Sequence, residues 1–204
     1  MEDWRESLFV WKGIFIINNS CIEWKGTWVS TNDAINDYPT IDDFQSSKND
    51  FLLNANITND TNNTDHVDDD TMNISFNGYY LLDNGNGLEK YHDIVHDMIC
   101  IKDKVNSNKW YCYAKGDTEF GQFISKGILI FDDNNTTDGT LTLARRYVYS
   151  KKDTRLSMPL DISVKQMISE LSSSSSSSNN DPKPWENLPM KEKKQQKRKR
   201  NNDE

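Results

Sequence analysis

Two histidines four residues apart, His92 and His96, are the first groups in this chain that could do chemistry. On a helix this spacing places both imidazoles on one face, where they can bind a metal ion. Cys100 and Cys112 follow and would supply sulfur ligands. However, the glutamate of the His-Glu-x-x-His motif has no counterpart here, and residues 98–101 have the pattern of a strand. We therefore predict no metal site and no cofactor.

Nucleophilic catalysis has few candidates as well. The chain holds three histidines, no Gly-x-Ser-x-Gly motif and no cysteine in a recognised catalytic signature. Residues 115–124 contain glycines and acids, but they lack the Gly-Lys-Ser/Thr ending of a phosphate-binding loop and are typical of a hairpin. Asp65 and its neighbours at 68–70 lack the residue order of an EF-hand calcium loop. We expect a protein without catalytic activity.

The cysteines and the first residues bear on the compartment. Cys21, Cys100 and Cys112 form no Cys-x-x-Cys pair and leave one thiol unpaired in any disulfide scheme. The N-terminus is acidic and lacks the apolar run of a signal peptide. No apolar stretch approaches the roughly 20 residues that a membrane-spanning helix needs. We expect a soluble intracellular protein with reduced thiols.

A glycine stands between two aromatic residues at three places in the chain. Side chains alternate along a strand, so each glycine and its two rings would share one face. Glycines often mark bends where barrels curl, which favours core packing. The alternative is a cavity lined by the six rings, as in ligand-binding barrels. The three triplets are Trp11, Gly13 and Phe15; Trp24, Gly26 and Trp28; and Phe76, Gly78 and Tyr80.

Short apolar runs separated by turn residues continue over residues 1–150. They are rich in β-branched and aromatic residues, which are typical of strands. This spacing predicts an all-β domain, a single small antiparallel β-barrel or sandwich of about 7–9 strands. The runs lie at residues 8–17, 21–29, 51–53, 74–82, 96–103, 109–114, 122–131 and 141–149.

Three segments differ from the strand pattern. Residues 54–73 are rich in Asn, Asp and Thr and predict a long, disordered acidic loop within the domain. Residues 151–171 predict a linker and a short amphipathic helix, because apolar residues recur there at helical spacing. Residues 172–204 begin with a run of serines and predict a disordered tail.

One resemblance concerns both ends of the predicted barrel. Gly26-Thr27-Trp28 near the start, with Arg145 and Arg146 in the last predicted strand, resembles the Gly-x-Trp motif and late basic residue of the lipocalin-like (calycin) β-barrels. In that superfamily the basic side chain packs across the tryptophan and closes the end of the barrel. The resemblance covers a few residues and implies a barrel, with a hydrophobic ligand as an alternative function.

Charge is divided unevenly along the chain. Residues 1–171 hold 27 Asp and Glu against 16 Lys and Arg, whereas residues 172–204 hold 5 against 8. An acidic body repels phosphate, so we expect nucleic acid to bind at most weakly, through the tail. The basic residues of the tail resemble a nuclear-import signal read by importin-α and predict a nuclear location, with a cytoplasmic one as the alternative. They are Lys191, Lys193, Lys194, Lys197, Arg198, Lys199 and Arg200.

The same tail holds three large apolar residues, Trp185, Leu188 and Met190, in polar surroundings. A disordered segment gains nothing from an exposed tryptophan unless a partner binds it, so these residues predict a docking motif for an unidentified protein. The sequence thus predicts a non-enzymatic nuclear β-barrel that acts as a protein-interaction module. The alternative is a barrel that binds a small hydrophobic molecule.

Overall fold

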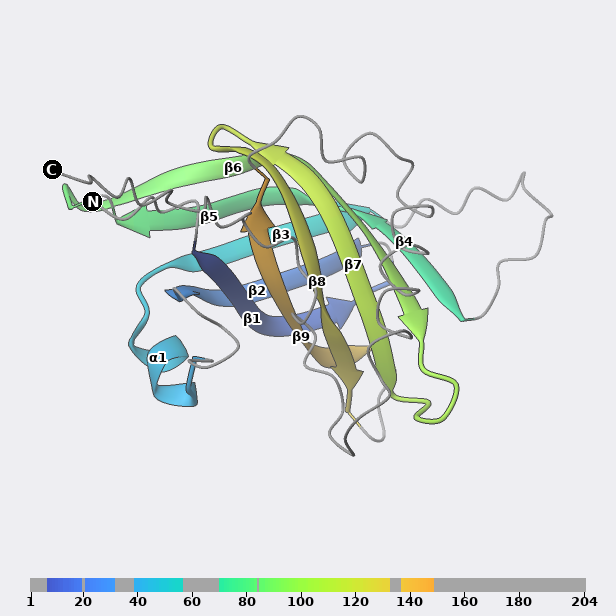
Figure 1. Cartoon of the computed structure of the whole chain (residues 1–204). Helices are drawn as coiled ribbons and strands as arrows, with labels where there is room; N and C mark the ends of the chain where they lie inside the picture. Colours follow the sequence, from blue (N-terminus) through green and yellow to red (C-terminus); the bar gives the residue numbers. More distant parts are fainter. Residues whose placement is uncertain are drawn as a thin grey trace, which may run out of the picture.

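The computed structural model describes residues 7–19, 21–31, 39–56, 70–83, 85–132 and 137–148, which form a β-barrel with one short helix (Figure 1). In chain order the elements are β1 (Leu8–Ile17), β2 (Cys21–Thr31), α1 (Ile41–Ser46), β3 (Asp50–Asn56), β4 (Thr71–Ser75), β5 (Asn77–Asp83), β6 (Leu88–Lys102), β7 (Lys109–Thr118), β8 (Gly121–Phe131) and β9 (Asp138–Tyr147). Among the described residues, no helix has the length and apolar character needed to cross a membrane.

Eight strands close the barrel through antiparallel pairs, in the order β1, β2, β3, β5, β6, β7, β8 and β9. The ring closes where β9 pairs with β1, with Leu143 opposite Trp11. β4 is the ninth strand and pairs with the second half of β6, beside β5. The predicted all-β antiparallel barrel is therefore confirmed, and the closed ring decides against the sandwich.

The glycine triplets lie at points where two strands approach closely inside the barrel. Gly13 and Gly26 are cross-strand partners on β1 and β2. A Cβ on Gly13 would lie 2.0 Å from the backbone oxygen of Lys25, and a Cβ on Gly78 would lie 2.1 Å from that of Leu52. Since no side chain fits there, these glycines let the strands coil tightly enough to close a barrel of eight strands.

Helix α1 was not predicted, because the sequence around it has no long apolar period. Thr40 and Asp43 cap it reciprocally, each side chain bonding to the backbone of the other. Phe44 is its buried residue, and the Thr27 hydroxyl of β2 donates to the Phe44 carbonyl over 3.1 Å. Phe44 belongs to a second apolar cluster that also holds Leu8 and Val10 of β1, apart from the barrel interior.

Several predicted boundaries were wrong. Residues 54–56 of the expected loop 54–73 belong to strand β3, and residues 71–73 belong to strand β4. Strand β6 begins at Leu88, well before the predicted start at residue 96. The predicted helix at 151–171 and the tail at 172–204 lie outside the described residues.

Candidate functional site

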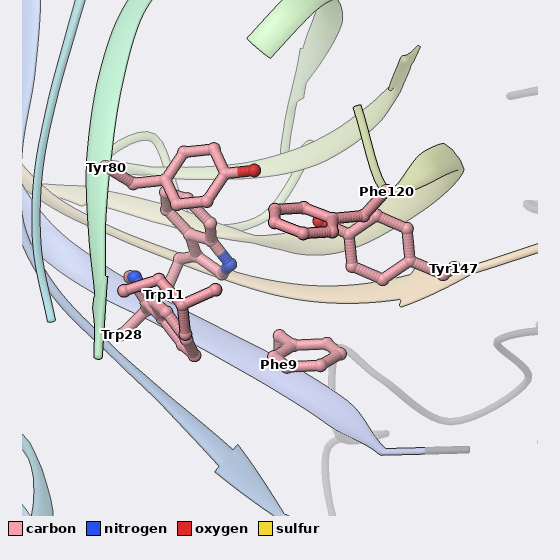
Figure 2. Close-up of a pocket in the computed structure, with 7 residues that line it drawn as sticks. Phe9, Trp11, Trp28, Tyr80, Phe120 and Tyr147 are labelled. Carbon is pink, nitrogen blue, oxygen red and sulfur yellow. The ribbon is translucent and has the colours of Figure 1, made fainter. Parts of the chain in front are cut away.

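A pocket of about 260 Å³ opens inside one end of the barrel, walled almost entirely by aromatic rings (Figure 2). Its lining comes from the first half of β1, the second half of β2, the middle and second half of β5, the end of β9, and the β7–β8 turn. The lining residues are Phe9, Trp11, Trp28, Tyr80, Leu82, Phe120 and Tyr147.

Strand alternation explains how most of these side chains reach the pocket. Phe9 and Trp11 are two residues apart on β1, and Tyr80 and Leu82 are two apart on β5, so each pair points inward together. Phe120 differs because it lies in the tight turn between β7 and β8. There the Thr118 hydroxyl accepts from the Phe120 N–H at 3.0 Å, and Gly121 adopts a φ of 117°. That left-handed backbone favours glycine and turns the Phe120 ring over the pocket.

The rings of the pocket wall support one another. The indole of Trp11 stacks on that of Trp28, with centroids 6.0 Å apart and planes 18° from parallel. Phe9 meets Trp28 and Tyr147 edge to face at 5.7 and 5.5 Å. Trp28 is further fixed because its Nε1 donates to the Leu81 carbonyl over 3.1 Å. Such contacts hold the wall in one arrangement without a ligand.

A buried ion pair lies against the Trp11 ring. The Arg145 guanidinium is sandwiched between the rings of Trp11, 4.2 Å from its centroid, and Phe123, 3.7 Å away. Its two terminal nitrogens bind both carboxylate oxygens of Asp93, at 3.1 and 2.9 Å. The positive charge is therefore neutralised within the core, and cation–π contacts add to this.

His96 completes this buried group. Its Nδ1 lies 3.0 Å from Asp93 Oδ2, and because a carboxylate only accepts, Nδ1 carries the proton. Burial lowers the pKa of His96 and outweighs the opposing hydrogen bond to Asp93, so the ring is neutral. Burial would raise the pKa of Asp93, but the charge of Arg145 and the hydrogen bond from His96 hold that pKa well below its usual value. Asp93 is thus ionised.

A β-bulge brings Asp93 and His96 to the same side of β6. Asp93 pairs with Thr118 and Val95 pairs with the adjacent Asp117, so Ile94 is the extra residue. Without this insertion, two residues three apart would face opposite sides of the sheet. Ile94 is 65% exposed, whereas Asp93 and His96 are buried. The bulge therefore places a carboxylate and an imidazole in the interior together.

The structure separates the histidines that could have held a metal. His92 is exposed and its Nδ1 lies 2.8 Å from the Gly78 carbonyl, whereas His96 is buried in the barrel. Cys100 and Cys112 face each other across β6 and β7, with sulfurs 2.6 Å apart. Within the described ranges, no three His, Cys, Asp or Glu side chains gather as metal ligands would.

The six rings predicted as cavity lining divide into two groups. Trp11, Trp28 and Tyr80 line the pocket. Phe15, Trp24 and Phe76 are at most 1% exposed and belong to the packed core. The two interpretations of the triplets, core packing and cavity lining, therefore each apply to part of the barrel. One end holds a pocket, and the middle is filled with side chains.

The expected closure by a basic residue on Trp28 needs correction. Arg145 is buried and packs on Trp11, the tryptophan of the first triplet, which in turn stacks on Trp28. Arg146, the next residue of β9, is only half-buried. The reason is the strand register, which places Arg145 opposite Phe9 on β1. The import signal at 191–200 and the docking residues at 185–190 lie outside the described residues.

Sequence reasoning missed Phe9, Leu82, Phe120 and Tyr147, which complete the pocket. Phe9, Leu82 and Tyr147 fell inside predicted strands, so counting inward positions along each strand would have found them. The position of Phe120 depends on a turn and has no comparable signal.

A comparison with known protein families, curated proteins and solved structures finds nothing that matches this chain. The closed barrel of eight antiparallel strands is compatible with the calycin-like resemblance, and no family is shown.

Proposed function

We propose that this barrel binds a small, largely apolar molecule in the aromatic pocket. The observation that carries the proposal is the preformed pocket of about 260 Å³ with six aromatic rings and one leucine in its wall. Ligand sites are typically concave, mostly apolar and already formed before binding. An engineered cavity of about 150 Å³ accepts benzene, so two fused rings suit the volume found here.

The rest of the interior supports this choice. The neighbouring core residues Phe15, Trp24 and Leu53 have no exposed surface, so the barrel is well packed beneath the pocket. An apolar hollow forfeits packing contacts among its lining atoms, which a ligand would restore. Because of this pocket, we propose the ligand-binding alternative in place of the interaction module that the sequence favoured.

Titration with naphthalene, followed by ¹H–¹⁵N NMR of the full chain, tests this function. We expect saturable shifts for the indole signals of Trp11 and Trp28 and for the amides of Tyr80 and Phe120. The amides of Lys109 and Phe131, at the opposite end of β7 and β8, should stay unchanged and serve as the internal control. An absence of saturable shifts up to the solubility of naphthalene would reject the proposal.

The nuclear location is a separate proposal, supported by the basic run at 191–200 alone. A fluorescently tagged chain should accumulate in nuclei, and replacing Lys197, Arg198, Lys199 and Arg200 with alanine should return it to the cytoplasm. Equal cytoplasmic distribution of both chains would contradict it.

A further inference from the structure

The Trp11 indole gives the pocket a polar requirement. Trp11 is 3% exposed, and among the described residues its Nε1–H has no hydrogen-bond acceptor. Figure 2 shows this nitrogen turned toward the space between the rings of Tyr80, Phe120 and Phe9. A buried N–H without a partner costs free energy, typically about 1–3 kcal/mol, which a suitable ligand would recover.

The neighbouring tryptophan in the same pocket wall has a hydrogen-bond acceptor for its indole N–H. Trp28 is equally buried, but its Nε1 already donates to the Leu81 carbonyl. Of the two stacked indoles, Trp11 is therefore the one whose N–H has no acceptor among the described residues. The two residues form a matched pair for experiment, because they share ring type, stacking and pocket face.

Charge in the pocket argues against an ionised ligand. Among the described residues, the cation packed on the Trp11 ring is Arg145, and its guanidinium is bound by both oxygens of Asp93. Burial also raises the pKa of the Tyr80 hydroxyl, which keeps it neutral. The lining residues that the structure describes carry no charge, so a carboxylate entering among them would lose its hydration without gaining a counter-charge from them.

Resting on the proposed function, we propose that the ligand is a neutral, planar molecule of about two fused rings whose hydrogen-bond acceptor pairs with Trp11 Nε1–H. The rings would lie against the aromatic wall, and a carbonyl-type oxygen would point toward the indole nitrogen. Phe120 is carried by a turn, whereas the other lining residues lie on strands.

Coumarin and naphthalene test the acceptor, because both are neutral fused bicycles and coumarin alone has a carbonyl. Dissociation constants are measured for both with the full chain, Trp11→Phe and Trp28→Phe. The preference for coumarin over naphthalene should fall about five-fold in Trp11→Phe, as expected for one neutral hydrogen bond. It should stay unchanged in Trp28→Phe. The ratio of the two ligands cancels any effect of a variant on packing alone.

The outcomes separate this inference from the proposed function. If both probes bind and Trp11→Phe leaves their ratio unchanged, the acceptor requirement is wrong and the binding function stands. If neither probe binds the unmodified chain, both proposals fail. Coumarin-3-carboxylate should bind at least about ten-fold more weakly than coumarin; equal affinity would overturn neutrality.

A measurement on the unmodified chain covers the case in which Trp11→Phe does not fold. The indole proton of Trp11 should move downfield on saturation with coumarin, since hydrogen bonding to a carbonyl deshields it, and naphthalene should not cause this shift. The indole proton of Trp28 is already bonded, so its shift should differ little between the coumarin and naphthalene complexes, and this difference is the internal control. If the Trp11 proton shows the same change with both probes, the proposal is wrong.

Discussion

Arg145 and Asp93 form a two-pronged ion pair in the interior of the barrel, joining β9 to the bulge of β6. Both side chains are at most 1% exposed. A buried pair of this kind is costly to assemble but more costly to break, because the remaining charge would have no partner. The pair therefore ties barrel stability to two residues that the sequence places far apart.

Removing one partner should destabilise the barrel more than removing both. We expect Asp93→Leu and Arg145→Met each to lower the free energy of unfolding by about 3–5 kcal/mol, and the double variant to lose less than their sum. Urea unfolding followed by circular dichroism measures this. Arg146→Met, one residue along and half-buried, should cost about 1 kcal/mol or less. Additive losses would show that the two charges do not interact.

Acid should destabilise the barrel in two steps. The folded-state pKa of His96 is lowered, so the unfolded chain binds its proton first and stability falls as pH drops below about 6.5. The pKa of Asp93 is also lowered in the fold, so a second loss begins below about pH 4. Each proton contributes a slope of at most about 1.4 kcal/mol per pH unit.

Unfolding curves between pH 8 and 3 check this, with His96→Gln as the control. Glutamine keeps a donor for Asp93 but does not titrate, so the decline near pH 6.5 should weaken and the one below pH 4 should persist. A variant with the same profile as the unmodified chain would rule out His96 as the source.

Gly13→Ala should be among the most damaging small changes. Its Cβ would lie 2.0 Å from the backbone oxygen of Lys25, and backbone cannot move aside as a flexible side chain would. We expect a loss of about 3 kcal/mol or more in the free energy of unfolding. Gly85→Ala is the control, since a Cβ there meets nothing within 4 Å and costs only the strain of its φ of 87°, about 1 kcal/mol. Similar losses would mean that the β1–β2 approach is not tight.

Filling the pocket should abolish binding without unfolding the barrel. Leu82 lines the pocket and is only half-buried, so Leu82→Trp would occupy the space with a fused ring of its own. Leu81→Trp, on the opposite face of β5, should leave binding unchanged. Naphthalene titration of both variants, with thermal unfolding to confirm folding, measures the effect. Undiminished binding by Leu82→Trp would place the ligand elsewhere.

The two interior thiols should be unreactive in the folded chain. Cys100 and Cys112 have no exposed surface, and burial raises the pKa of Cys112 well above its usual value, which suppresses the reactive thiolate. Cys21 is half-buried on β2. Iodoacetamide followed by mass spectrometry should therefore label Cys21 first, and all three cysteines only in denaturant. Equal labelling rates would show that the barrel opens readily.

Most of the fold could be predicted from the pattern of strands in the sequence. Alternation around Trp11 and Trp24 and the glycines between the rings predicted an antiparallel barrel or sandwich, and the rings do face the interior of a barrel. The short capped helix α1 and the early start of β6 were missed. Their residues, such as Asp42 and Glu89, are too polar for local propensity to reveal structure set by tertiary pairing.

The candidate site was predictable only in part. Trp11, Trp28 and Tyr80 follow from strand alternation, but alternation does not distinguish the open end of a barrel from its filled middle. The group formed by Asp93, His96 and Arg145 depends on one bulge and on the register between β1 and β9. Both are long-range features that no local pattern contains.

The pairing of β1 with β9 has a consequence for how the chain is made. The first strand obtains its second neighbour from the last one, Phe9 lying opposite Arg145. During synthesis one edge of β1 therefore stays unpaired, and its rings stay exposed, until β9 has left the ribosome. Contacts of such sequence separation slow folding, and unpaired edges invite aggregation. We expect the nascent chain to need shielding until β9 is available, so that its cellular yield would follow chaperone capacity as well as final stability.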